Sequence, residues 1–201
     1  MTLGHFRPVR LHTVGAFVVL WSLFLSETRS QIRESGFAFE ACVEPKAGIL
    51  AGAPYTGWVA GIGVGYKFTE YSLWLSALAG PVKREGRDPD VDARDDYGVL
   101  RFTARRRFPV DSTISVVPLV GYHISTFLIP GGATINGTGF EAGVGVTVGL
   151  GELFEVGGEA AYTHDSYHHR SGPVPPTSSF SGSDLALRFL VRFHPAISPH
   201  N

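Results

Sequence analysis

The chain has 201 residues, which is enough for one domain, and its 17 basic and 18 acidic residues leave a formal net charge of -1. This balance excludes a strongly basic surface of the kind that binds nucleic acid. The chain has 25 glycines and is 12% aromatic, a composition that suits closely packed strands with rings at an interface. The single cysteine cannot form an internal disulfide, so no disulfide framework is expected.

Residues 1–30 have the pattern of a cleaved secretory signal peptide. Arg7 and Arg10 supply positive charge, residues 14–25 form an uncharged apolar segment, and residues 28–30 place small residues at a cleavage site. As a helix, this apolar segment would span only about 20 Å, whereas the hydrocarbon core of a bilayer is about 30 Å thick. We therefore expect cleavage after residue 30 and export across the inner membrane.

The mature chain is predicted to form eight β-strands, because apolar and polar residues alternate in eight segments of about ten residues each. The segments span residues 37–44, 58–68, 71–79, 100–105, 114–125, 140–148, 154–163 and 184–193. The last of them shows the alternation most clearly. Its apolar face consists of Leu185, Leu187, Phe189, Val191 and Phe193. No run of about 18 uncharged apolar residues follows Gln31, so a membrane-spanning helix is not expected there.

The predicted connections between strands alternate in length. The short ones are residues 69–70, 109–112 and 150–152, and the long ones are residues 45–55, 81–96, 128–137 and 165–183. This alternation predicts an up-and-down antiparallel meander with both termini at the end that carries the short turns. Transmembrane barrels have this asymmetry, and their strands of about 9–11 residues match the bilayer thickness.

The two faces of the predicted strands differ in size and charge. One face holds nearly all the large apolar residues, and the other holds glycine, serine and a balanced set of charges. The charged face predicts an ion-pair network in the lumen, made of Glu40, Lys67, Arg101, Arg105, Glu141, Glu155, Glu159, Arg188 and Arg192, with Glu44 on the same face. An eight-stranded barrel has room inside only for side chains, so these charges would fill it while the apolar face meets lipid.

A soluble barrel is the alternative to this arrangement. A periplasmic, lipocalin-like ligand carrier also has alternating strands, but its apolar face turns inward around the ligand. The aromatic residues near the predicted strand ends favour the membrane, where they would lie at the two interfaces.

Over residues 36–193 the pattern resembles the small eight-stranded outer-membrane β-barrel proteins represented by the OmpA membrane domain and OmpX. The resemblance includes a final strand that ends in an aromatic residue, Arg192-Phe193, although a short tail, residues 194–201, follows here. It implies an all-β, eight-stranded antiparallel up-and-down transmembrane β-barrel in the outer membrane. It also implies outer-membrane lipids, lipopolysaccharide and the barrel-assembly machinery as partners, with no cofactor.

This resemblance makes a structural or interaction role the leading hypothesis. The packed lumen would not conduct ions, and the loops at residues 81–96 and 165–183 would be available to bind an extracellular ligand. Pro118 is a difficulty for the predicted fold, because it removes a backbone donor from the middle of a strand in a closed sheet. We therefore predict a bulge at Pro118, which leaves the facing of residues 119–126 open.

His123, Ser125 and Glu141 are the clearest candidates for catalysis. Two residues apart on a strand, His123 and Ser125 share a face, and Glu141 on the next strand could orient the imidazole, as in an activated serine nucleophile. The arrangement is similar to that of the outer-membrane lipid A deacylases, which implies a lipid-directed hydrolase. By their alternation, however, all three residues point into the barrel, whereas an enzyme acting on membrane lipid needs them outside. We favour their membership in the interior polar network.

His164, His168 and His169, with Asp165, are candidates for a zinc or copper site because imidazole is the commonest side-chain metal ligand. The proline- and serine-rich segment that follows has the composition of a mobile, solvated loop. The sequence therefore favours no metal site here.

Overall fold

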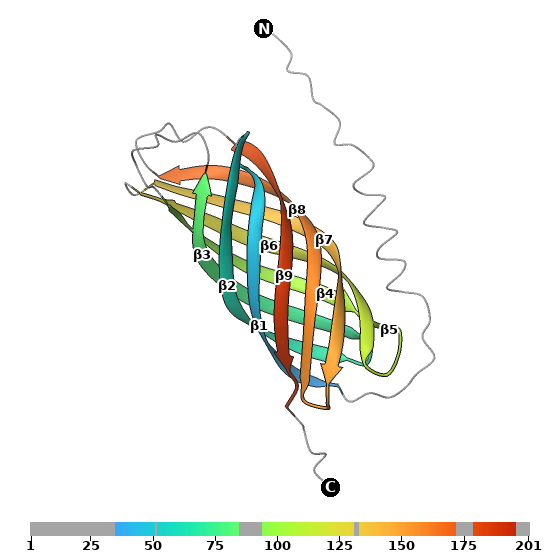
Figure 1. The fold of residues 1–201 in the computed structure, drawn as a ribbon. Coiled ribbons are helices and arrows are strands. Elements are labelled where there is room, and N and C mark those ends of the chain that lie inside the picture. Colours follow the sequence, from blue (N-terminus) through green and yellow to red (C-terminus); the bar gives the residue numbers. More distant parts are fainter. Residues whose placement is uncertain (1–34, 51, 85–93, 131–132, 172–178, 196–201) are drawn as a thin grey trace, which may run out of the picture. The chain divides into compact units, whose positions relative to one another are not determined.

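The computed structural model describes residues 35–50, 52–84, 94–130, 133–171 and 179–195, and these residues form an all-β structure (Figure 1). The strands are β1 (Gly36–Leu50), β2 (Ala53–Phe68), β3 (Tyr71–Arg84), β4 (Asp95–Arg106), β5 (Phe108–Pro109), β6 (Ile114–Ile129), β7 (Ala133–Leu150), β8 (Phe154–Ser171) and β9 (Ser179–Phe193). The expected signal peptide and residues 196–201 of the tail lie outside the described residues. Among the residues that are described, no helix is long and apolar enough to cross a bilayer.

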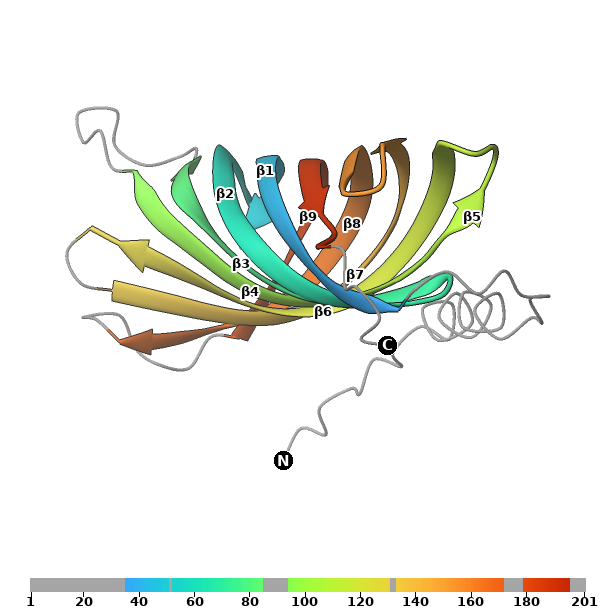
Figure 2. The ribbon, with the colours of Figure 1, turned by 90° about the horizontal axis from the view of Figure 1, so that it is seen from below.

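Antiparallel pairing closes the sheet into a barrel. The hydrogen-bonded order runs β4-β3-β2-β1-β9-β8-β7-β6, and β4 pairs with β6 to complete the circle. The two-residue strand β5 continues the line of β4 along β6 and lies at one end of the barrel (Figure 2). The prediction of an all-β, eight-stranded up-and-down barrel is therefore confirmed. Within the described residues, closure leaves the eight long strands without an exposed sheet edge, which is what allows a β-structure to span lipid.

The first and last strands of the barrel have their outer termini at the same end of the barrel, since Phe39 of β1 pairs with Phe193 of β9. We call this end of the barrel the turn end, because the connections at residues 69–70 and 151–153 are there. We call the opposite end the loop end. At the loop end the strands run further than the sequence analysis predicted. The predicted loop 45–55 is wrong, because β1 and β2 continue until only residues 51–52 connect them.

The other long connections are also shorter than predicted. The loops predicted at residues 81–96, 128–137 and 165–183 shrink to residues 85–94, 130–132 and 172–178. In each case polar residues interrupt the apolar face, although the strand itself continues.

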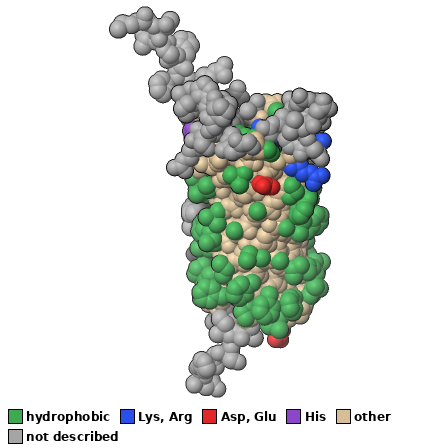
Figure 3. All heavy atoms as spheres, turned by 90° about the vertical axis from the view of Figure 1, so that its left-hand side faces the viewer, with side chains coloured by type: hydrophobic (Ala, Val, Ile, Leu, Met, Phe, Trp, Pro, Cys, Tyr) green, Lys and Arg blue, Asp and Glu red, His purple; other side chains and the backbone are tan. Residues whose placement is uncertain are grey.

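The outer wall carries an apolar belt (Figure 3). Its exposed side chains include Phe37, Phe39, Val43, Trp58, Ile62, Val64, Phe68, Leu75, Leu100, Phe102, Tyr122, Ile124, Phe140, Val144, Val146, Tyr162, Leu185, Leu187, Phe189 and Val191. On β2 the belt runs from Phe68 to Trp58, or about 33 Å along the strand and about 25 Å along the barrel axis at a tilt of about 40°. This height matches the apolar band of transmembrane barrels. The soluble carrier with an inward apolar face is therefore wrong.

Beyond the belt, at the loop end, the two faces of the wall exchange character. On β6, Ile124 faces outward and Ser125 inward, but two residues later polar Thr126 faces outward and Phe127 is fully buried inside. We call this region of the barrel the rim. Its outer face carries exposed polar side chains: Thr56, Lys83, Asp96, Thr138, His164, Ser166, His168, Ser179 and Ser181. Its interior holds an apolar cluster that includes Leu50, Tyr55, Val59, Val82, Tyr97, Phe127, Ile135 and Tyr167. The rim therefore has the arrangement of a water-soluble protein, although β1 keeps an exposed Ile49 and β6 an exposed Leu128.

No bulge forms at Pro118, and that prediction is wrong. Pro118 pairs with Val144 in a β6–β7 register that continues without a shift on both sides. On its other side Pro118 lies across from the junction of β4 and β5, where the sheet pairing is interrupted. A residue without an N–H is tolerated at such an interruption. Residues 119–126 therefore keep the facing that the alternation predicts.

Candidate functional site: the lumen and its two ends

Most of the charged residues predicted to lie in the lumen do lie there and are buried. These are Glu40, Arg101, Arg105, Glu141, Glu155, Glu159, Arg188 and Arg192, together with Glu44. Lys67, from the same predicted set, is only half-buried and lines a cavity at the turn end. The alternation of each strand sends these side chains inward, and the belt residues between them face out.

Arg188 is the centre of this group. Its Nε lies 2.9 Å from Glu44 Oε2, its Nη1 lies 3.5 Å from Glu159 Oε2, and its Nη2 contacts Glu141 Oε2. Arg101 bridges two of the same acids, with Nη2 2.9 Å from Glu44 and Nε 3.1 Å from Glu141. Since these side chains are buried, their charges depend on one another for the interactions that bulk water would otherwise supply.

Toward the turn end a second arginine has a similar role. Arg192 contacts Glu40 at 2.8 Å, Glu155 at 2.7 Å and Glu159 at 2.8 Å. Both Arg192 and Arg105 lie over the Trp74 ring, at 5.0 and 5.3 Å from its centroid. Both are within the range of a cation–π interaction.

The Trp74 ring reaches this position because its neighbour on β2 is Gly65. A Cβ atom at Gly65 would lie 2.4 Å from the ring, closer than real atoms approach.

Ion pairs connect the two ends of the lumen. A continuous path runs through Lys46, Glu44, Arg188, Glu159, Arg192, Glu155 and Arg107. Lys46 also pairs with Asp184 at 2.9 Å, and Tyr55 donates a hydrogen bond to the same carboxylate at 2.7 Å. Lys46 is absent from the predicted network because it falls in the predicted loop 45–55. The continued two-residue period from Glu40 through Glu44 to Lys46 was the signal that could have identified it.

Above the ion pairs, an aromatic layer fills the lumen at the level of the rim. Phe127 lies at its centre, with ring centroids 4.7 Å from Tyr97, 5.7 Å from Tyr55 and 5.7 Å from Tyr167. All four rings are at most 1% exposed. The lumen is therefore filled by ion pairs in the belt and by packed rings in the rim.

Comparison with known proteins identifies the family. The family model described as an outer membrane protein beta-barrel domain matches residues 36–193. This chain belongs to that family. The outer-membrane location expected from the sequence is thereby confirmed. No curated protein sequence matches the chain.

Solved structures of outer-membrane barrels are similar to this chain at low sequence identity. Neisserial surface protein A (NspA) has a TM-score of 0.58 at 13% identity, with 80% of this chain and 99% of NspA covered. A major outer membrane protein of Thermus thermophilus gives 0.49 at 14% identity, covering 77% of this chain and 98% of that one. Ail of Yersinia pestis gives 0.43 at 14%, covering 79% and 99%. At such identities the likeness to NspA shows the fold alone.

In this outer-membrane barrel the three catalytic candidates face the lumen. His123, Ser125 and Glu141 are each at most 2% exposed. His123 Nε2 lies 2.5 Å from Asp165 Oδ1, so its partner is a residue that the sequence analysis had placed in a loop. Glu141 is held by Arg101, Arg188 and the Thr103 hydroxyl, which donates to Oε1 at 3.0 Å. The predicted contact of Glu141 with the imidazole is therefore replaced by contacts with arginine.

The histidine group proposed for metal binding is divided by the wall of the barrel. His164 and His168 lie on the outer face of β8 and are exposed, whereas Asp165 between them is buried inside. The side chain of His169 lies outside the described residues. Among the described side chains, no three histidine, cysteine, aspartate or glutamate residues are placed to share a metal ion. The predicted loop position of these residues is wrong, because β8 continues to Ser171.

Proposed function

We propose that this protein is a non-conducting outer-membrane barrel that acts by contact, presenting its rim and loop-end connections to a partner outside the cell. The filled lumen is the observation that supports a non-conducting role most directly. A path for ions would have to cross both the aromatic layer and the ion pairs of Arg188 and Arg192. Small eight-stranded barrels are filled by side chains in this way, whereas channels belong to wider barrels.

The rim supports a role in contact. The barrel continues past the apolar belt with a polar outer wall and an apolar interior, so its loop end stands in water rather than in lipid. Short turns face the periplasm in outer-membrane barrels, so the rim faces outward from the cell. The connections at residues 85–94 and 172–178 begin from this raised rim.

Lipopolysaccharide is the partner that we propose for the base of the β3–β4 connection. Exposed Lys83 and Arg94 lie at the two ends of this connection, beyond the apolar belt. Arg84 beside them already pairs with buried Asp95. Exposed cations at this height can meet the phosphate groups of the outer leaflet.

Conductance across a planar lipid bilayer tests the non-conducting role. The refolded protein is expected to insert without producing discrete current steps, and a porin added afterwards to the same bilayer serves as the positive control. Steps of reproducible size from the barrel alone would refute the proposal.

Binding of purified lipopolysaccharide tests the role in contact. The double variant Lys83→Gln with Arg94→Gln should bind more weakly, whereas Ser166→Gln on β8, on the far side of the rim, should bind as the wild type does. Equal binding by all three proteins would refute this assignment.

A further inference from the structure

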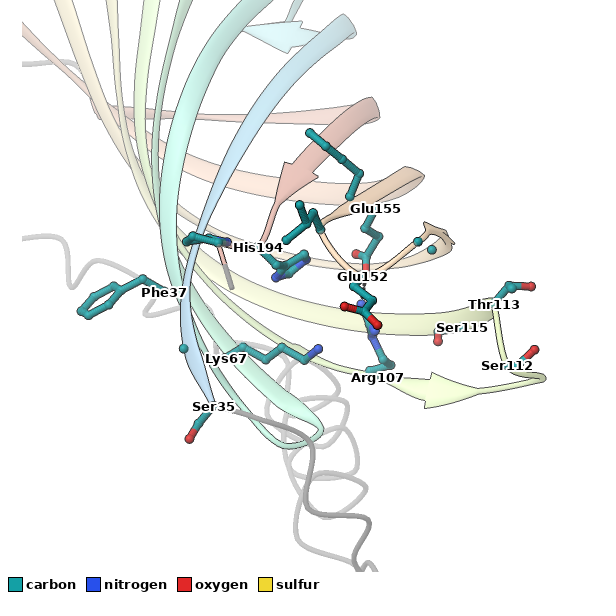
Figure 4. A pocket seen from close by; sticks show the side chains of 16 residues that line it. Ser35, Phe37, Lys67, Arg107, Ser112, Thr113, Ser115, Glu152, Glu155 and His194 are labelled. Carbon is teal, nitrogen blue, oxygen red and sulfur yellow. Dashed lines mark ion pairs between the residues drawn. The ribbon is translucent and has the colours of Figure 1, made fainter. Parts of the chain in front are cut away.

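A cavity of about 460 Å³ opens at the turn end of the barrel (Figure 4). It lies between the ends of β1, β2, β8 and β9 and the connections that precede β6 and β8. Its volume is within the range of about 300–1,000 Å³ that is typical of small-molecule sites. The Phe37 side chain points away from the cavity, whereas Lys67, Arg107 and His194 line it (Figure 4). This cavity faces the periplasm and lies at the opposite end from the contact surface proposed above.

Backbone hydrogen bonds hold the walls of the cavity in place. The Arg107 N–H donates to Glu70 O at 2.7 Å, and the His194 N–H donates to Leu153 O at 2.7 Å. The Gly149 N–H donates to Thr113 O at 2.8 Å. These bonds join segments that are far apart in the sequence, so the cavity is formed before any ligand arrives. A preformed site loses less conformational freedom on binding.

Charged and hydroxyl side chains of several elements form the polar part of the lining. Lys67, Arg107 and the hydroxyl groups of Ser112 and Ser115 contribute to the wall. The acidic groups of the lining are Glu152 and Glu155. Glu155 is already engaged by two arginines, since Arg192 Nη1 lies 2.7 Å from its Oε1 and Arg107 contacts its Oε2. Glu152 is exposed at the opening, so water screens its charge.

The lowered pKa of His194 indicates a positive electrostatic environment in this cavity. Its pKa is lowered to about 4, first by burial and then by the positive charges of Lys67, Arg107 and Arg192. Its Nε2 atom is buried without a hydrogen-bond partner among the described residues. In the neutral ring this nitrogen can donate a hydrogen bond to a ligand that replaces water.

We propose that the cavity binds a small periplasmic anion that carries a carboxylate or a phosphate group. Lys67 would pair with its charge, Arg107 would share its guanidinium donors between Glu155 and the anion, and His194 would donate to one of its oxygens. Charge-assisted hydrogen bonds of this kind are the strongest that side chains offer. The proposal stands apart from the contact role of the rim, since either can fail while the other holds.

The experiment titrates the refolded mature chain, in micelles of an uncharged detergent, with two probes in separate runs. Inorganic phosphate is one probe, and N-acetyl-trialanine, which ends in a carboxylate, is the other. Amide NMR signals are expected to shift saturably at Gly149, Gly151 and His194. Lys67→Gln and Arg107→Gln should each weaken binding about tenfold or more, because each removes one charge-assisted hydrogen bond.

Two matched controls define the result. Tyr122→Phe alters an exposed side chain on the outer face of the belt, away from the cavity, and should leave the affinity unchanged. The amide of N-acetyl-trialanine lacks the carboxylate and should not bind. If only one probe saturates, the site selects the group that this probe carries.

The proposal is overturned if the shifts with both probes grow linearly and spread over the barrel. It is also overturned if Lys67→Gln, shown to be folded by its resistance to SDS before heating, binds as tightly as the wild type does.

Discussion

Substitution of Arg188 by methionine tests whether the ion pairs in the lumen hold the barrel together. Methionine has a similar length and no charge, so it fills most of the space while removing the contacts with Glu44, Glu141 and Glu159. The three carboxylates then keep their full cost of burial and lose one shared partner.

The size of the effect follows from the partners that remain. Loss of one member of a buried ion pair typically costs about 3–5 kcal/mol. Here each acid keeps another cation: Glu44 and Glu141 keep Arg101, and Glu159 keeps Arg105. We therefore expect the free energy of unfolding to fall by about 3 kcal/mol, at the lower end of this range.

Urea titration of the protein refolded in lipid vesicles measures this free energy, with tryptophan fluorescence as the signal. Trp74 lies inside the barrel next to the network, and Trp58 lies outside, so the signal reports both faces of the wall. The control is Lys83→Met, which removes an exposed charge and should change the free energy by less than about 0.5 kcal/mol. A change that small in Arg188→Met would refute the reasoning, because the network would then contribute nothing to stability.

Two further predictions concern single side chains. Ser125→Ala should give the same acylation of lipid A as the wild type in a strain that overproduces the protein, because Ser125 is buried in the lumen away from lipid. Mass spectrometry of lipid A measures this acylation. Removal of an acyl chain by the wild type but not by the variant would establish an enzyme. His194 should make stability sensitive to acid, because a pKa lowered to about 4 from the ordinary value of 6.5 means that the folded state favours the neutral ring. Its contribution is complete above about pH 6.5 and decreases as the pH falls toward 4. Between pH 7.5 and pH 5, the urea midpoint of unfolding should therefore fall further in the wild type than in His194→Gln. An equal fall in both proteins would contradict the assignment.

The sequence predicted the belt region of the barrel well because one physical rule governs it. Where lipid surrounds the wall, large apolar residues such as Phe189 must face out, and charged residues such as Arg188 must face in and find partners. The period of two along each strand then fixes which residues share the lumen. The facing of His123 and Ser125 could be predicted in the same way, despite Pro118.

The same rule fails at the rim, which explains the strand ends that were predicted too early. On β8 the outward residue changes from Tyr162 to Ser166, while the inward residue changes from Thr163 to Tyr167. The period of two is unbroken, but the apolar residues move to the other face. A search for one continuous apolar face therefore stops where water replaces lipid. The His123–Asp165 contact could not be predicted for this reason, since it joins β6 to β8 over Gly139 of β7, and Asp165 lies beyond the predicted end of β8.

The exchange of faces also divides the barrel into two parts that can change independently during evolution. Below the exchange, an outward position such as Tyr162 has to remain apolar, whereas Ser166 on the same strand can vary like any surface residue. On β2 the wall continues from Trp58 to Ala53, about 16 Å along the strand, before it turns. Connecting segments of new sequence can therefore be exchanged at the loop end while the membrane-embedded half keeps both its composition and its depth in the bilayer.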